Sequence, residues 1–128
     1  MAEAVAYGVI AGLVTALISC VAAALVCTFS SDPDKLTAPL STAACILAHF
    51  VAGVVSAKKK NAALPAGLAS GGCLALIFWM ISLCFGESYS YGMGVAVTVL
   101  IRLSMVAVSL FAALLGVNAG GRKRRRRR

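Results

Sequence analysis

Three polar residues that lie inside apolar stretches are the places in this sequence where chemistry could occur. Arg102, His49 and Ser104 each sit well within a run of apolar side chains. An arginine in such surroundings can attract an anion or the acid of a partner, and a histidine can change its charge near neutral pH. A serine hydroxyl that approaches an imidazole is the beginning of a nucleophilic site. These three residues form the candidate polar site of the chain.

The groups that would complete a catalytic or metal site are missing from the apolar runs. No Asp or Glu lies within them to form an acid pair or a Ser-His-Asp set. The five cysteines form no Cys-x-x-Cys pair and lack the polar neighbours of a metal site. We therefore expect no enzyme, no metal and no cofactor, and interpret the cysteines as small packing residues. A disulfide between Cys27 and Cys84 is the alternative for that pair.

The elements that carry these residues are four long apolar runs. They cover about residues 4–29, 39–57, 62–85 and 93–117, and 61% of the 128 residues are hydrophobic. Each run has the roughly 17–25 residues that cross a hydrocarbon core about 30 Å thick. In lipid only helices satisfy the backbone of such a segment, and short connections make neighbours antiparallel. The sequence predicts an all-α polytopic membrane protein, a four-helix bundle forming one domain over residues 1–121.

Proline and glycine mark the expected ends of two helices. Pro33 and Pro39 flank the first connection, where a missing amide proton costs little. Gly120 and Gly121 are expected to end the fourth helix before a basic tail at residues 122–128. The first apolar run is longer than the 7–15 residues of a signal-peptide core and has no basic segment before it, so we expect it to be a spanning helix.

The charges predict the orientation of the bundle. Ten of the twelve Lys and Arg residues lie in the second connection and in the tail, whereas Asp32, Asp34 and Glu87 lie in the first and third connections. Short basic segments stay in the cytoplasm, which predicts a multi-pass protein of the cell membrane with both termini cytoplasmic. The basic residues are expected to contact anionic lipid headgroups at that face: Lys58, Lys59, Lys60, Arg122, Lys123, Arg124, Arg125, Arg126, Arg127 and Arg128.

The polybasic tail has two further interpretations. Arginine-rich segments bind RNA phosphates, but this tail has no interleaved aromatic residues for base stacking, so sequence-specific nucleic-acid recognition is not expected. Tethering to a ribosome or to another acidic partner is the alternative to a segment that fixes topology on the inner leaflet.

Arg102 and His49 are predicted to lie at a similar depth in the membrane. Their positions in the fourth and second runs place them roughly 14 and 15 Å from the external boundary, at about 1.5 Å per residue. A cation at the centre of a span costs on the order of 2.5–3.5 kcal/mol. Arg102 could bind an anion or a partner, or could extend toward the interface with backbone partners. His49 could be a proton switch or a hydrogen-bonded core residue.

Small residues recur at a spacing of four on every predicted helix. Such faces let helix backbones approach closely, which matters because lipid provides no hydrophobic force between helices. We expect them to close the bundle of a single chain, with a homo-oligomer as the alternative. The glycines assigned to helix packing are Gly8, Gly12, Gly53, Gly67, Gly71 and Gly116.

The chain resembles a known family in its second and third helices and at the end of its fourth. The residues that carry the resemblance are the stretch from Val51 to Lys60, the following Ala66-Gly67-Leu68 with Gly71-Gly72, and Leu115-Gly116-Val117-Asn118. They resemble the YrzE-like family of small four-helix membrane proteins, found mainly in Gram-positive bacteria of the Firmicutes. The resemblance implies a bacterial membrane protein of uncharacterised function, with no catalytic or binding residues to carry over.

Two functions follow from these patterns. The first is a non-enzymatic structural or accessory subunit that binds other membrane components, through its small-residue faces and Arg102. The second is a small oligomeric transporter or channel with an anion-attracting path near Arg102 and His49. The absence of a carboxylate inside the runs argues against a proton-coupled exporter.

Overall fold

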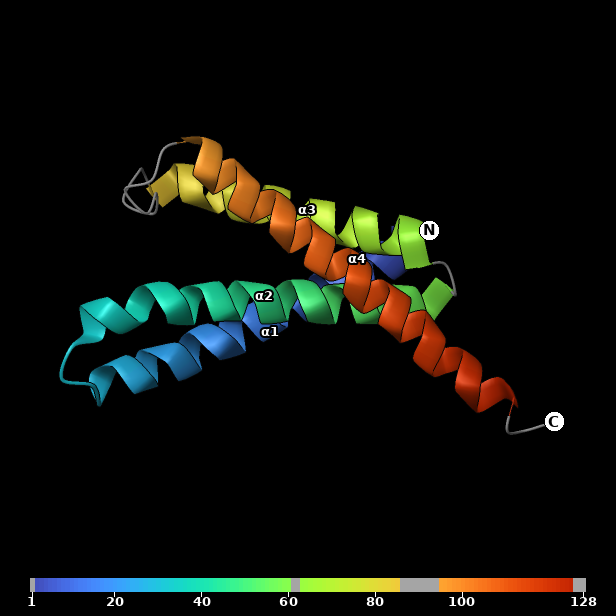
Figure 1. Ribbon diagram of the computed structural model, residues 1–128, viewed down its shortest axis with the longest axis horizontal. Helices are drawn as coiled ribbons and strands as arrows, with labels where there is room; N and C mark the ends of the chain where they lie inside the picture. Colours follow the sequence, from blue (N-terminus) through green and yellow to red (C-terminus); the bar gives the residue numbers. More distant parts are fainter. Residues whose placement is uncertain (1, 61–62, 86–94, 126–128) are drawn as a thin grey trace.

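The chain folds into four helices (Figure 1), which confirms the predicted all-α class. The computed structural model describes residues 2–60, 63–85 and 95–125. Within them lie α1 (Ala2–Thr28), α2 (Pro33–Lys60), α3 (Ala63–Phe85) and α4 (Val95–Arg125). Each helix is long and apolar enough to cross a membrane. A helix that spans lipid exposes apolar side chains outward, and large side chains such as Leu17 and Leu100 are exposed here.

Two helices extend past the apolar runs. α2 begins at Pro33 rather than at Pro39, because a proline at the first helical position loses no hydrogen bond. Pro39 therefore lies inside α2, where the Thr37 hydroxyl donates to the Pro33 carbonyl oxygen at 2.8 Å. α4 continues through Gly120 and Gly121 to Arg125 instead of ending there. A single glycine costs a helix only about 1 kcal/mol, so neither glycine must break it.

Consecutive helices run antiparallel and form two hairpins, α1–α2 and α3–α4 (Figure 1). α2 is central, because it contacts each of the other three helices, and its contacts with α1 and α4 are the most extensive. α1 packs on α2 and α3 but makes no contact with α4 within the described residues. α2 and α4 run in the same direction and cross, so the two hairpins are joined mainly at this crossing.

The buried residues gather in one half of the bundle. They lie at 4–12 in α1, 44–57 in α2, 66–74 in α3 and 105–116 in α4. We call these segments the packed half. The remaining segments, 13–28, 33–43, 75–85 and 95–104, form the divergent half, in which no side chain that the structure describes is buried. Figure 1 shows the two hairpins separating toward the end where α1 joins α2.

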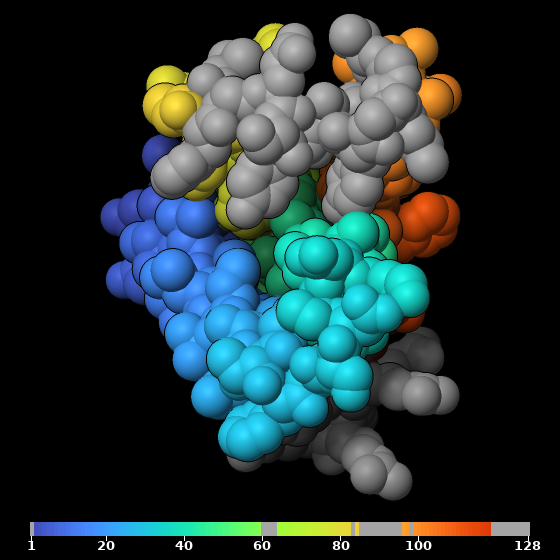
Figure 2. Space-filling view, turned by 90° about the vertical axis from the view of Figure 1, so that its left-hand side faces the viewer, coloured from blue at the N-terminus to red at the C-terminus, as the bar shows by residue number. Residues whose placement is uncertain are grey.

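The two ends of the bundle carry opposite charges. At the end of the divergent half, Asp32 and Asp34 lie where α1 meets α2, and Lys35 pairs with Asp32 at 2.6 Å. We call this the acidic end. Viewed from the acidic end, the surfaces of α1 and α2 lie side by side (Figure 2).

The opposite end of the bundle is basic. Lys58 and Lys59 lie in the last turn of α2, near the start of α1, and α4 ends at Arg125. Glu87 and Arg126–Arg128 lie outside the described residues.

Candidate functional site

The closest approach between helices is the crossing of α2 and α4 at Gly53. A methyl group built on Gly53 would collide with the backbone carbonyl oxygen of Ser109 and lie 3.1 Å from the Ala112 Cβ. Only a hydrogen in place of a side chain permits this separation of backbones. At the next residue of α2, the backbone of Val54 meets Gly116 of α4, with 3.1 Å from the would-be Cβ of Gly116 to the Val54 carbonyl oxygen.

The remaining glycines assigned to packing also lie at helix contacts. Gly8 and Gly12 place α1 against α2: a Cβ at Gly8 would be 2.8 Å from the Ala52 carbonyl oxygen. Gly67 and Gly71 place α3 against α4, where a Cβ at Gly71 would be 2.7 Å from the Ser109 Cβ. All six glycines predicted to pack thus meet another helix of the same chain. Gly72 differs, because nothing lies within 4 Å of its would-be Cβ.

Three buried serines join α2, α3 and α4 in the packed half. The Ser56 hydroxyl lies 3.1 Å from the Ser70 hydroxyl and 3.3 Å from the Ala66 carbonyl oxygen across the α2–α3 contact. The Ser109 hydroxyl donates to the Gly67 carbonyl oxygen at 3.1 Å, across the α3–α4 contact. Because each polar atom has a partner, this network stabilises the interior and provides no free binding group.

The sequence did not predict this network. A weak signal existed, since Ser70 lies between Gly67 and Gly71 on the face where α3 was expected to pack. Ser109 had no such signal. Its bond reaches a carbonyl of another helix, and the sequence alone does not specify which helices meet.

His49 is buried in the interior with one ring nitrogen unsatisfied. Its Nδ1 lies 2.8 Å from the Cys45 carbonyl oxygen, and its ring tilts against that of Phe78 on α3 at a centroid distance of 5.7 Å. A carbonyl oxygen can only accept, so Nδ1 carries the proton and Nε2 of the neutral ring is a hydrogen-bond acceptor. Nε2 is buried and has no partner among the described residues. A buried acceptor without a donor is an exception that requires an explanation.

Arg102 is half-buried in the divergent half of α4. It lies close enough to Cys45 of α2 to interact electrostatically with that thiol, and Cys20 of α1 is close to the same thiol. Cys45 precedes His49 by one helical turn on α2, but no direct interaction joins Arg102 to His49 within the described residues. No hydrogen bond or ion pair joins Arg102 to another side chain in the described part of the chain.

Ser104 does not share this site. It is exposed, and its hydroxyl donates to the Ile101 carbonyl oxygen of its own helix at 2.6 Å. Two positions along a helix separate side chains by about 200°, so Arg102 and Ser104 face different sides of α4. The serine that sequence reasoning placed beside His49 is therefore satisfied locally, and the hydroxyl–imidazole pair is not formed.

The basic end has one specific contact. The Lys59 ammonium lies over the Tyr7 ring at 3.2 Å from its centroid, which joins the end of α2 to the start of α1 by a cation–π interaction. Lys58 and Lys59 are exposed, and α4 carries the backbone of Arg122 and Lys123 beyond the spanning segment. Exposed cations at one end of an apolar bundle suit anionic headgroups.

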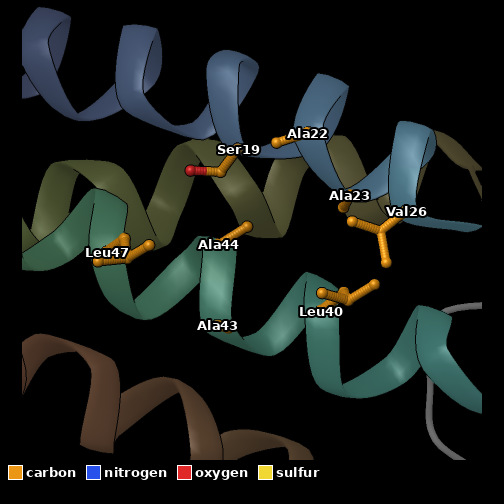
Figure 3. A pocket seen from close by; sticks show the side chains of 8 residues that line it. All are labelled: Ser19, Ala22, Ala23, Val26, Leu40, Ala43, Ala44 and Leu47. Carbon is orange, nitrogen blue, oxygen red and sulfur yellow. The ribbon is translucent and has the colours of Figure 1, made fainter.

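A cavity of about 190 Å³ lies between α1 and α2, where the divergent half meets the packed half (Figure 3). Its walls are small or aliphatic, and the Ser19 hydroxyl is the polar group among the lining side chains: Ser19, Ala22, Ala23, Val26, Leu40, Ala43, Ala44 and Leu47. No titratable group lines it, so it provides nothing for acid–base chemistry.

The five cysteines are free, including Cys27 and Cys84, and the described residues hold no group of three metal-ligating side chains.

The fold and these sites define a class, a four-helix protein with candidate membrane spans in every helix and a half-buried arginine in one of them. The chain belongs to the family described as "Protein of unknown function (DUF3792)", whose model matches residues 1–121. Neither a curated protein nor a solved structure matches the chain significantly.

Proposed function

We propose that this chain is a non-enzymatic accessory subunit of the cell membrane that binds another membrane component. Its place within the matched family would be the YrzE-like group, and its setting a Gram-positive bacterial membrane with both termini in the cytoplasm. The resemblance of the 51–60 segment and the charges of the two ends support this setting.

The observation that carries the proposal is the division of the bundle into two halves. The packed half uses its six predicted packing glycines and three serines within the chain, which leaves that half a self-contained unit. The divergent half has no buried side chain among those that the structure describes, yet it contains Arg102 without a described partner. A bundle that is closed at one end and separated at the other has a surface that a further membrane component can complete.

The basic end supports a second contact, with the headgroups of membrane lipids. Lys58 and Lys59 are exposed there, and the tail continues the charge in the sequence. Near an anionic leaflet each such residue contributes about 1 kcal/mol, reduced by salt. We propose that this end binds anionic headgroups at the cytoplasmic face and holds the bundle in one orientation.

The test of the accessory role is purification of the tagged chain in mild detergent. Light scattering gives the mass of the protein complex, and mass spectrometry identifies companions, with the untagged chain in the same membranes as the control. We expect one membrane protein at a fixed ratio to the tagged chain. A monomer or a homo-oligomer with no companion would contradict the accessory role.

A small oligomeric transporter is the second candidate function. The observation that favours it is the half-buried Arg102, a cation within a candidate span that has no described partner. Such a cation could line a path that attracts anions. In that case purified chains would form an oligomer, anion flux into reconstituted vesicles would be measurable, and Arg102→Ala would abolish the flux while the variant stays folded. Unchanged flux in that variant would exclude the path.

A further inference from the structure

The charge of Arg102 has no counterpart among the residues that the structure describes. Arg102 is half-buried in the spanning part of α4, and the described acids, Glu3, Asp32 and Asp34, lie at helix ends. On α2 it interacts electrostatically with the thiol of Cys45, well inside that helix. A cation within a span is expensive and in most proteins marks a function, with a partner that compensates it.

A second copy of the chain cannot provide that partner at the same depth. The sequence has four acidic residues, and they are Glu3 at the start of α1, Asp32 and Asp34 between α1 and α2, and Glu87 after α3. None of the four lies within an apolar run of the sequence. A homo-oligomer would therefore bring several Arg102 side chains together without a carboxylate among them, and like charges in low dielectric repel.

We propose that Arg102 binds the carboxylate of an Asp or Glu inside a membrane-spanning helix of a different protein, and that this helix contacts the divergent half of the bundle. This inference rests on the proposed accessory role and names the partner's chemistry. Arginine and a carboxylate form paired hydrogen bonds of fixed geometry, which orient the two helices as well as attract them. The partner benefits from the same pair, because a carboxylate inside a membrane span also requires an opposite charge.

His49 takes no part in this contact. It is 1% exposed, and its Nε2 is buried without a partner among the described residues. A helix on the outside of the bundle therefore cannot donate to it, and the proposal rests on Arg102 alone.

The experiment compares variants of Arg102 in the tagged, full-length chain. Arg102→Leu should lower the amount of companion protein per tagged chain at least tenfold, and Arg102→Lys should retain part of it because the charge remains without the paired geometry. Lys35→Gln removes an exposed cation that already pairs with Asp32, and Ser104→Ala removes a hydroxyl that bonds its own helix. Both controls should keep the companion at the wild-type level.

Two further measurements make the result decisive. Gel filtration of the Arg102→Leu variant should give one sharp peak, because the change removes an unpaired cation from the span. The companion should have an Asp or Glu inside a span, and exchanging the charges, Arg102→Glu here and the acid to Arg in the companion, should restore the complex.

Each contrary outcome has its own meaning. A companion retained by Arg102→Leu overturns this inference and leaves the accessory role standing. A companion without an acid in its spans does the same. Loss of a bound anionic lipid in place of a protein would show that Arg102 holds a headgroup phosphate. A wild-type chain that purifies alone contradicts the accessory role itself.

Discussion

At the scale of single residues, Gly53 is the position most sensitive to a change in size. A methyl group there meets the Ser109 carbonyl oxygen, which belongs to a backbone and cannot move aside as a side chain could. We expect Gly53→Ala to destabilise the bundle by about 1–3 kcal/mol, the usual range for an overpacked contact. Gly72→Ala is the matched control, since nothing lies within 4 Å of that position. The measurement is unfolding of the protein in mixed detergent micelles, and equal stability of the two variants would contradict the crossing of α2 and α4 described here.

The packing role of the glycines could be predicted from the sequence, but the hydrogen-bond partners of the serines could not. The packing glycines were recognised because their spacing puts them on one face, and a face of small residues has one main use in a membrane helix. A serine hydroxyl in a membrane helix can bond a carbonyl oxygen of its own helix or of a neighbouring helix. Ser104 bonds the carbonyl of its own helix, whereas Ser109 bonds that of Gly67 on α3, and nothing in the local sequence distinguishes them.

At the scale of helices, Ser109 joins α3 to α4 within the second hairpin. Removing its hydroxyl leaves the Gly67 carbonyl oxygen without that donor. We expect Ser109→Ala to lower the free energy of unfolding by about 0.6 kcal/mol, and by at most about 1.7, as for hydrogen bonds between membrane helices. Ser104→Ala should cause no change. The fluorescence of Trp79, the single tryptophan, reports on α3 during unfolding. A larger loss in Ser104→Ala than in Ser109→Ala would contradict the assignment.

The number and class of the helices followed from hydropathy, but two of their ends did not. Apolar runs show where a chain can lie in lipid, and a helix can continue beyond the hydrocarbon. α2 gains its first turns from Pro33 onward, in a segment with Asp34 and Lys35, because proline is tolerated at a helix start. α4 similarly continues through Gly120 to Arg125. A polar helical turn and a polar loop have similar compositions, so hydropathy alone could not place these ends.

At the scale of the whole molecule, the division into two halves was not predictable. Every helix has small residues along much of its length, so the sequence did not indicate that those of one half would meet while the others separate. The electrostatic interaction of Arg102 with Cys45 depends on the same arrangement, because α4 crosses α2 near Gly53. Counting along each helix predicts a similar depth for Arg102 and His49, which stays a prediction.

The orientation of the bundle decides which leaflet surrounds Arg102. Short basic segments are retained in the cytoplasm, so the basic end should face inward and the acidic end outward. In a chain whose five cysteines are replaced by alanine, Ser31→Cys should react with a membrane-impermeant maleimide in intact cells. Glu3→Cys, at the other end of α1, should react only after the membrane is permeabilised. The reverse pattern would place the basic end outside. With the predicted pattern, the divergent half lies toward the outer leaflet, and a partner acid that pairs with Arg102 must lie in the outer half of its own helix.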